Sequence, residues 1–134
     1  MLCPVFHRHT YSGPVMLLYM QKIAIIIPCY NEEKRLQKKA FADFLSLHAD
    51  AVLLFVNDGS SDNTSSILNS IQSGAVNRVK VITLEKNAGK ANAVRTGLLD
   101  SVSENGFAYA GYLDADLSTS PEEFYRLFLL MKER

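Results

Sequence analysis

Residues 22–33 read Lys-Ile-Ala-Ile-Ile-Ile-Pro-Cys-Tyr-Asn-Glu-Glu, so a continuous apolar run gives way abruptly to polar residues. A run that is apolar at every position is typical of a strand buried on both faces, as in a sheet covered by helices on each side. A second such run covers residues 52–57, and shorter β-branched or aromatic runs cover 78–84 and 107–113. The sequence therefore predicts four strands.

Helical patterns separate these strands and follow the last one. Ser120 is a predicted N-cap, with Pro121 at the first helical position and Glu123 completing a capping box. Apolar stripes at helical spacing predict the buried faces. They comprise Leu36, Ala40, Phe41, Phe44, Leu45 and His48, then Ile67, Leu68 and Ile71, then Ala91, Val94, Leu98 and Val102, and finally Phe124, Leu127, Phe128 and Met131.

The alternating order of strands and helices predicts an α/β fold. We expect three layers, with a mostly parallel, Rossmann-like sheet covered by helices on both faces. A chain of 134 residues, 48% hydrophobic and 21% charged, is sufficient for one domain or part of one.

Charge and cysteine content exclude some classes of function. Fourteen basic and fourteen acidic residues cancel, so no overall field attracts nucleic acid or an acidic membrane surface. The two cysteines, Cys3 and Cys29, do not form a disulfide framework and indicate a reducing compartment. We therefore predict a cytoplasmic protein without a nucleic-acid partner.

Residues 1–20 are expected to form a poorly ordered segment, and residues 21–134 the folded domain. The apolar run Val15–Met20 is too short for a membrane span or a convincing secretory signal. His7 and His9 are spaced as a metal-binding pair, although histidines in a terminal segment with Pro and Gly are more often solvated.

Polar loops follow all four predicted strands, over residues 28–33, 58–64, 85–90 and 114–118. In open α/β sheets, ligands bind outside the carboxyl ends of the strands. The sequence therefore predicts that these four loops meet along one edge of the sheet and carry the function.

The stretch from Tyr112 to Ser118 places Asp114 and Asp116 two residues apart, just after the fourth strand. Residues i and i+2 of an extended chain point the same way, so both carboxylates converge on one cation. Mg²⁺ or Mn²⁺ suits oxygen ligands and keeps part of its shell for phosphate oxygens. The alternative is a solvated acidic loop.

Each of the other loops also has a purely structural interpretation. Asn31 is a good helix N-cap, with two glutamates placed in a first turn. Residues 58–60 have turn chemistry, and Asp62 is a plausible cap of the next helix. Lys90 either contacts phosphate at a helix N-terminus or is merely solvated. Cys29 is expected to be a small packed thiol.

Four motifs in this order resemble the N-terminal half of family 2 glycosyltransferases of the GT-A fold. They are Ile-Ile-Ile-Pro-Cys-Tyr-Asn-Glu-Glu at 25–33, Val-Asn-Asp-Gly-Ser-Ser-Asp-Asn-Thr at 56–64, Asn-Ala-Gly-Lys at 87–90 with Ala-Val-Arg-Thr-Gly at 93–97, and Leu-Asp-Ala-Asp at 113–116. The similarity covers about 21–134. Within the family, the chain is most similar to polyprenyl-phosphate sugar transferases, particularly the dolichyl-phosphate β-glucosyltransferase-like branch.

The resemblance implies roles for individual residues. It implies that Asp58 accepts a hydrogen bond from the base, that Asp114 and Asp116 hold the metal, and that Lys90, or Lys86 beside it, assists the diphosphate. Ser118 stands where some relatives have a longer metal-contacting side chain, so no metal bond is expected from it. The full implied nucleotide-sugar site is Pro28, Tyr30, Glu32, Asp58, Lys90, Asp114 and Ala115.

The implied function is inverting, metal-dependent sugar transfer to a polyprenyl phosphate, with a UDP-sugar as the favoured donor and a GDP-sugar as the second choice. The sequence ends at Arg134, before the acceptor half and the catalytic base of such enzymes, so we expect a truncated sheet and a chain that binds donor without transferring sugar. The complete enzyme is expected to act at the cytoplasmic face of a membrane, although no residues here span one.

Two alternatives remain open at this point. The chain is compatible with a non-catalytic module that binds a nucleotide sugar. Residues 114–118 also match the loop of haloacid-dehalogenase-like phosphohydrolases, in which Asp114 is the nucleophile and Asp116 the acid or base. That loop normally follows the first strand of its domain, however, and requires residues far downstream.

Overall fold

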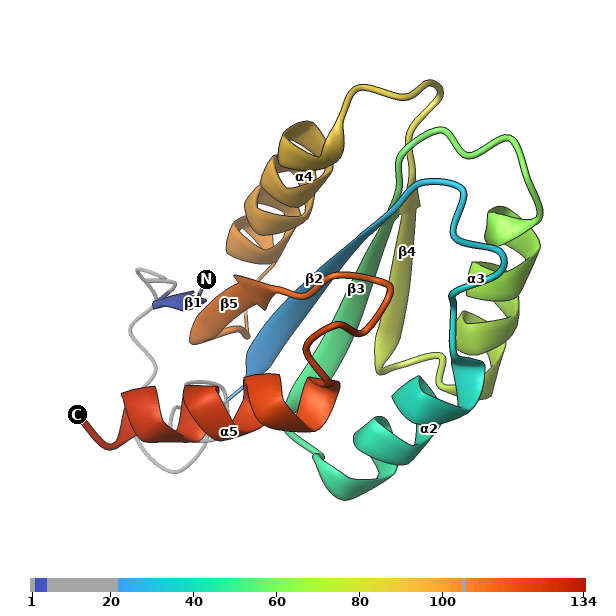
Figure 1. Cartoon of the computed structure of the whole chain (residues 1–134). Coiled ribbons are helices and arrows are strands. Elements are labelled where there is room, and N and C mark those ends of the chain that lie inside the picture. The colour runs from blue at the N-terminus through green and yellow to red at the C-terminus, as the bar shows by residue number, and fades with distance from the viewer. Residues whose placement is uncertain (1, 5–21, 105) are drawn as a thin grey trace.

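The computed structural model describes residues 2–4, 22–104 and 106–134, and its centre is one five-stranded sheet (Figure 1). The strand order is β1-β5-β2-β3-β4. The strands are β1 (Leu2–Pro4), β2 (Ile23–Cys29), β3 (Ala51–Asn57), β4 (Val79–Thr83) and β5 (Tyr109–Tyr112). β5, β2, β3 and β4 run parallel, and β1 is antiparallel to β5. The four predicted strands are therefore confirmed, and they form a parallel sheet.

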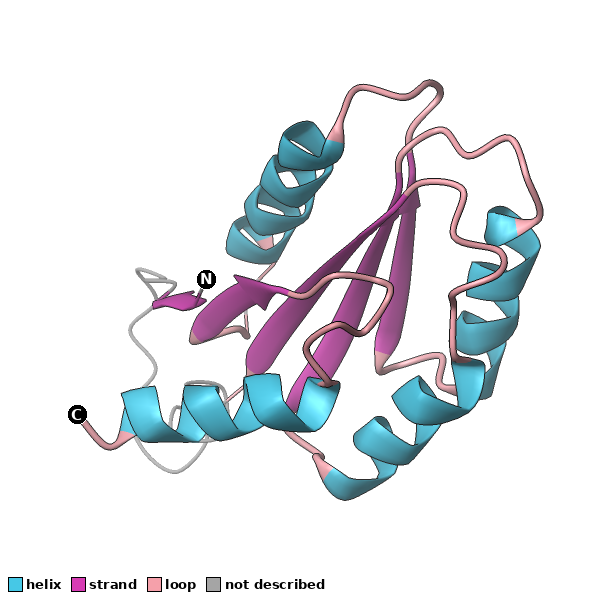
Figure 2. Cartoon of the chain, viewed as in Figure 1, coloured by secondary structure: helices cyan, strands magenta, loops and turns pink. Residues whose placement is uncertain are grey.

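Helices cover both faces of the sheet, so the predicted three-layer α/β architecture is confirmed (Figure 2). Every residue of β2 is buried. Ile25 of β2 packs in one apolar cluster with residues of α2, α3 and α5, whereas Ile26 packs in a second cluster with α4. The helices are α2 (Lys38–Leu47), α3 (Thr64–Gly74), α4 (Lys90–Ser103) and α5 (Pro121–Lys132).

α4 lies unusually close to the sheet, and its buried face differs from the predicted one. The buried residues are the small Ala93, Gly97 and Ser101. A Cβ atom added to Gly97 would lie 2.6 Å from the Ile26 side chain, so only a small residue permits this approach. The predicted stripe is confirmed only in part, because Leu98 packs against the second apolar cluster while its other members lie beside the contact or face solvent. Of that stripe, Val94 and Leu98 are partly buried, and Ala91 and Val102 are exposed.

α5 begins as the sequence predicts, with the Ser120 hydroxyl accepting a hydrogen bond from the backbone N–H of Glu123. The Glu123 side chain does not complete the capping box, because it pairs with Arg126. Leu127 was expected in the core but is 46% exposed. Tyr125 turns inward instead, and its hydroxyl lies 2.8 Å from both carboxylate oxygens of Asp50.

The first strand lies in the segment that was expected to be poorly ordered. Leu2 pairs with Gly111 and Pro4 with Tyr109, so β1 covers the outer edge of β5. Residues 5–21, which include His7, His9 and the run Val15–Met20, lie outside the described residues. The expected domain boundary near residue 20 stays a prediction.

None of the helices in the described part of the chain combines the length and the apolar character that crossing a bilayer requires.

Candidate functional site

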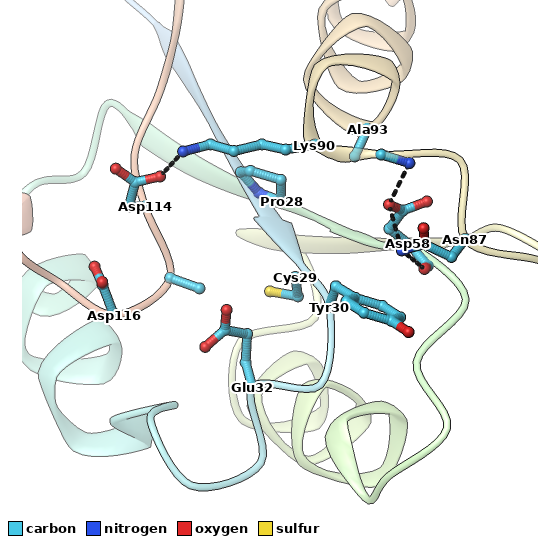
Figure 3. Close-up of a pocket in the computed structure, with 12 residues that line it drawn as sticks. Pro28, Cys29, Tyr30, Glu32, Asp58, Asn87, Lys90, Ala93, Asp114 and Asp116 are labelled. Atoms are coloured by element: carbon cyan, nitrogen blue, oxygen red, sulfur yellow. Dashed lines mark hydrogen bonds and ion pairs between the residues drawn. The ribbon is translucent and has the colours of Figure 1, made fainter.

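A cavity of about 420 Å³ opens where β2, β3 and β5 end, and loops from four strands line it (Figure 3). The residues of the predicted nucleotide-sugar and metal sites line this one pocket: Pro28, Tyr30, Glu32, Asp58, Lys90, Asp114, Ala115 and Asp116. Lys86, offered as the alternative to Lys90, is not among the lining residues. Cys29, Asn87, Gly89 and Ala93 complete the lining. The structure thus brings the predicted residues together, while their individual roles stay predictions.

The loops after β2 and β3 are tied to each other by Asn31. Its backbone is left-handed (φ 50°), and its side-chain oxygen accepts hydrogen bonds from the backbone N–H groups of Ser61 (2.9 Å) and Asp62 (3.3 Å). The structural interpretation of Asn31 as a helix N-cap is therefore not confirmed, because α2 begins only at Lys38, after Gln37. Asparagine tolerates the left-handed region better than most residues, which suits it to this position.

Asp62 strengthens the same connection. Its carboxylate accepts hydrogen bonds from the backbone N–H of Thr64 (3.0 Å) and of Glu33 (3.2 Å). The hydrogen bond from the Thr64 side chain is the main cause that lowers the pKa of Asp62. The N-cap position itself belongs to Asn63, one residue after the predicted cap. The two loops thus form one hydrogen-bonded unit beneath the pocket.

Asp58 links the loop after β3 to the loop after β4. Although charged, it is only 2% exposed. Its carboxylate accepts hydrogen bonds from the backbone N–H of Ala88 (2.9 Å), the backbone N–H of Gly89 (2.9 Å) and the side chain of Asn87 (3.1 Å). Asp58 therefore has the structural role that the sequence left open, and it also lines the pocket.

The last residue of β2 brings a buried thiol to the pocket, and the loop after β2 brings one ion pair. Burial, followed by the negative charge of Glu32, raises the pKa of Cys29 to about 12. The thiol is therefore protonated at neutral pH, and Cys29 packs in the core as expected. Glu32 points into the pocket, with its Oε2 2.8 Å from Nε of Arg35 (Figure 3).

The acidic loop after β5 does not continue the extended strand, because the backbone N–H of Leu117 donates a hydrogen bond to the carbonyl oxygen of Asp114 (3.1 Å) and closes a turn. Leu113 and Ala115 are buried, and Asp114 and Asp116 both line the pocket. Leu117 ends this turn with a φ of 57°, which is rare for a non-glycine residue. Such outliers concentrate at functional sites, because the surrounding structure has to hold them in place.

The two carboxylates of this loop have different partners. Asp114 forms an ion pair with Lys90, and this contact is the main cause that raises the pKa of Lys90. Asp116 accepts a hydrogen bond from the backbone N–H of Ser118 (3.0 Å), which is the main cause that lowers its pKa. The positive charges of Arg35 and Lys90 lower the pKa of Asp116 further. Ser118 thus positions Asp116.

The oxygen chemistry of Asp114 and Asp116 suits a divalent ion that takes its remaining coordination positions from a ligand. Among residues 2–4, 22–104 and 106–134, no group of three or more His, Cys, Asp or Glu side chains is placed to hold a metal by itself. Two carboxylates supply only oxygen ligands, which Mg²⁺ and Mn²⁺ prefer, and Mg²⁺ is commonly held by one or two carboxylates together with substrate phosphates.

The N-terminus of α4 adds a site for anions. Gly89 precedes this 14-residue helix, and Lys90 and Ala93 lie in its first turn, so the first turn faces the pocket. Unpaired backbone N–H groups and the helix dipole favour negative charge at such a position.

Asn87 is the lining residue whose role the sequence analysis missed. It donates a hydrogen bond to Asp58, 29 positions earlier in the chain. The available signal was its place in a polar loop after a strand, but nothing in the sequence pattern pairs it with Asp58.

Comparison with known proteins places these observations in a family. Residues 24–134 match the family described as glycosyl transferase family 2. An uncharacterized protein of Methanocaldococcus jannaschii is 38% identical over 108 residues, which are 81% of this chain and 46% of that protein. The undecaprenyl-phosphate 4-deoxy-4-formamido-L-arabinose transferase of Proteus mirabilis is 32% identical over 117 residues, which are 85% of this chain and 35% of that enzyme. The chain thus spans less than half the length of these relatives.

Solved structures share the fold. TarS residues 1–349 from S. aureus superpose with a TM-score of 0.63 at 21% identity, covering 84% of this chain and 32% of that one. The same protein in complex with UDP-GlcNAc gives a TM-score of 0.55 at 23% identity, with 84% and 31% covered. The mannosyltransferase PcManGT from Pyrobaculum calidifontis, in complex with GDP-Man and Mn²⁺, gives 0.56 at 20% identity, with 71% and 27% covered. The family match includes the acidic loop and does not support the phosphohydrolase alternative.

Proposed function

The chain belongs to glycosyl transferase family 2, and we propose that its pocket binds the nucleotide diphosphate sugar that donates the sugar in a glycosyl transfer. The observation that carries the proposal is the convergence of a buried carboxylate, a lysine and an acidic pair in one cavity of about 420 Å³. Each of these groups suits a different part of such a donor.

We assign the nucleoside to the side of the pocket formed by Asp58, Tyr30 and Pro28. Three hydrogen bonds fix the Asp58 carboxylate, and a carboxylate has about four acceptor sites. Asp58 therefore retains capacity to accept the ring N–H of a base. Tyr30, which is 47% exposed, offers an aromatic face at the rim.

The diphosphate belongs at the other side, between the first turn of α4 and the acidic loop. Lys90 and the backbone N–H groups of α4 attract phosphate oxygens. Asp114 and Asp116 would hold Mg²⁺ or Mn²⁺ there. When bound, such an ion stabilises the negative charge that grows on the departing nucleoside diphosphate. Glu32 and Ala115 border the space in between.

We propose a UDP-sugar as donor and a polyprenyl phosphate as acceptor. TarS, which shares the fold, has been solved with UDP-GlcNAc, and the P. mirabilis relative is an undecaprenyl-phosphate sugar transferase. PcManGT, which binds GDP-Man with Mn²⁺, supports a GDP-sugar as the second choice and a metal ion in either case. We further propose that the transfer inverts the anomeric centre and that the acceptor and catalytic base are supplied outside the residues seen here.

Replacing Asp116 by Ala should remove metal-dependent nucleotide binding. We expect wild-type protein to bind UDP at least about tenfold more tightly with Mn²⁺ than with EDTA, which equals about 1.4 kcal/mol, and the variant to lose this difference. Isothermal titration calorimetry measures both affinities. Asp43→Ala, an exposed carboxylate on α2, is the control. Equal UDP affinity with Mn²⁺ and with EDTA in the wild type would contradict the proposed site.

The remaining alternative is a module that binds a nucleotide sugar without catalysis. A sugar-transfer assay distinguishes it from an enzyme. The full natural protein, incubated with labelled UDP-glucose, Mn²⁺ and a polyprenyl phosphate, should form a lipid-linked sugar. Metal-dependent UDP binding without that product would favour the module.

A further inference from the structure

Lys90 places a positive charge against the acidic loop. It is the first residue of α4, and its side chain reaches from the helix to the carboxylate of Asp114 (Figure 3). Its ammonium also lies 5.8 Å from the ring centre of Tyr112, the last residue of β5. A carboxylate and an aromatic ring from the end of β5 therefore both contact this cation.

We propose that Lys90 is a stand-in for the metal ion: it neutralises Asp114 in the donor-free protein and transfers to the diphosphate when metal and nucleotide bind together. The inference rests on the proposed function, since it takes Asp114 and Asp116 as the metal ligands.

The ion pair has the properties that such an exchange requires. The side chains of Lys90 and Asp114 are 58% and 44% exposed, and exposed ion pairs are weak, so this pair breaks readily. Lys90 contacts Oδ1 of Asp114, so a metal ion that binds this carboxylate competes with the ammonium for its negative charge and is repelled by it.

The displaced ammonium remains useful because of its position. Lys90 stays fixed to the first turn of α4, where the helix dipole and backbone N–H groups also favour anions. Two carboxylates and a diphosphate together carry more negative charge than one divalent ion cancels. Lys90 provides a further positive charge for the loaded site.

This exchange couples the two ligands. Free metal has to displace Lys90 while nothing else receives the ammonium, so metal alone should bind weakly. With a nucleotide present, the ammonium gains the phosphate oxygens as partners, and the metal affinity should rise. Linkage requires that the metal raises the nucleotide affinity by the same factor.

The test compares Mn²⁺ binding with and without UDP, followed by the electron paramagnetic resonance signal of unbound Mn²⁺. Lys90→Met keeps a similar length but removes the charge, and it should bind Mn²⁺ alone about threefold to tenfold more tightly than the wild type. UDP should raise its Mn²⁺ affinity by a smaller factor than it does in the wild type. Lys90→Arg should behave as the wild type does.

Lys39→Met is the matched control, because Lys39 also pairs with an exposed aspartate, Asp43, but on α2. It should change neither affinity. Equal Mn²⁺ affinity of the wild type and Lys90→Met in the absence of UDP would overturn the inference. Failure of the proposed function gives a different result, in which UDP does not change the Mn²⁺ affinity of the wild type.

Discussion

Asp58→Asn is expected to lower the free energy of unfolding by about 2 to 3 kcal/mol and to weaken UDP binding by about 1 to 3 kcal/mol. The Asp58 carboxylate receives backbone N–H groups on both oxygens, from Ala88 and from Gly89. An amide replaces one of these oxygens by a donor, so one N–H of the loop after β4 loses its partner in a site that is 2% exposed. The same change removes the proposed acceptor for the base.

Urea denaturation gives the change in stability, and calorimetry with UDP and Mn²⁺ gives the change in binding. Asp43→Asn is the control, since this carboxylate is 61% exposed and pairs only with Lys39 among the residues described. It should change the stability by less than about 0.5 kcal/mol. If Asp58→Asn has wild-type stability and wild-type UDP affinity, then Asp58 has neither role. If it loses stability but binds UDP normally, its role is structural alone.

Gly59→Ala is expected to lower the free energy of unfolding by about 3 to 5 kcal/mol, through two effects that add. Gly59 has a φ of 67°, a region that costs energy for alanine. Its added Cβ atom would also lie 2.4 Å from the backbone nitrogen of Asn87 and 2.4 Å from the carbonyl carbon of Lys86. A backbone cannot rotate away as a side chain can, so the whole loop after β4 has to move.

Two other glycines separate these effects in the same denaturation experiment. Gly89 has a φ of 98° but open space around its Cβ position, so Gly89→Ala should show the cost of backbone strain alone. Gly74, at the end of α3, has open space and an ordinary φ, so Gly74→Ala should be neutral or slightly stabilising. If Gly59→Ala costs no more than the roughly 1 to 2 kcal/mol of left-handed strain, the close approach of the two loops is not rigid.

The fold was predictable wherever the pattern within one segment determines the structure. Every residue of β2 is buried on one face of the sheet or the other, and the continuous apolar run indicates this directly. The same reasoning does not predict which residues of α4 are buried. Its buried face consists of Ala93, Gly97 and Ser101, because the distance between helix and sheet selects for small size, and hydrophobic periodicity does not report that distance.

For the candidate site, the sequence predicts which residues belong to it but not which residues they bond to. Its members follow from one topological rule, that loops at the carboxyl ends of parallel strands meet, and the structure brings the residues of the predicted site to one pocket. Their partners do not follow from that rule. Asn31 bonds to Ser61 and Asp58 to Ala88, each across 30 positions, and such pairings depend on how two loops pack. The structural interpretation of Asn31 was therefore a cap of its own helix, because that is the interaction that local sequence suggests.

The strand order has a consequence for how the pocket is assembled as the chain folds. β2 pairs with β3 through residues 23 and 51, and β3 with β4 through residues 53 and 79, so these contacts close short loops. The pairing of β5 with β2 joins residue 109 to residue 23, and the pairing of β1 with β5 joins residue 2 to residue 111, so these contacts close much longer loops. Loop-closure entropy favours the shorter loops first. The half of the pocket with Asp58 should therefore form before Asp114 and Asp116 arrive, an order that pulsed hydrogen exchange during refolding measures.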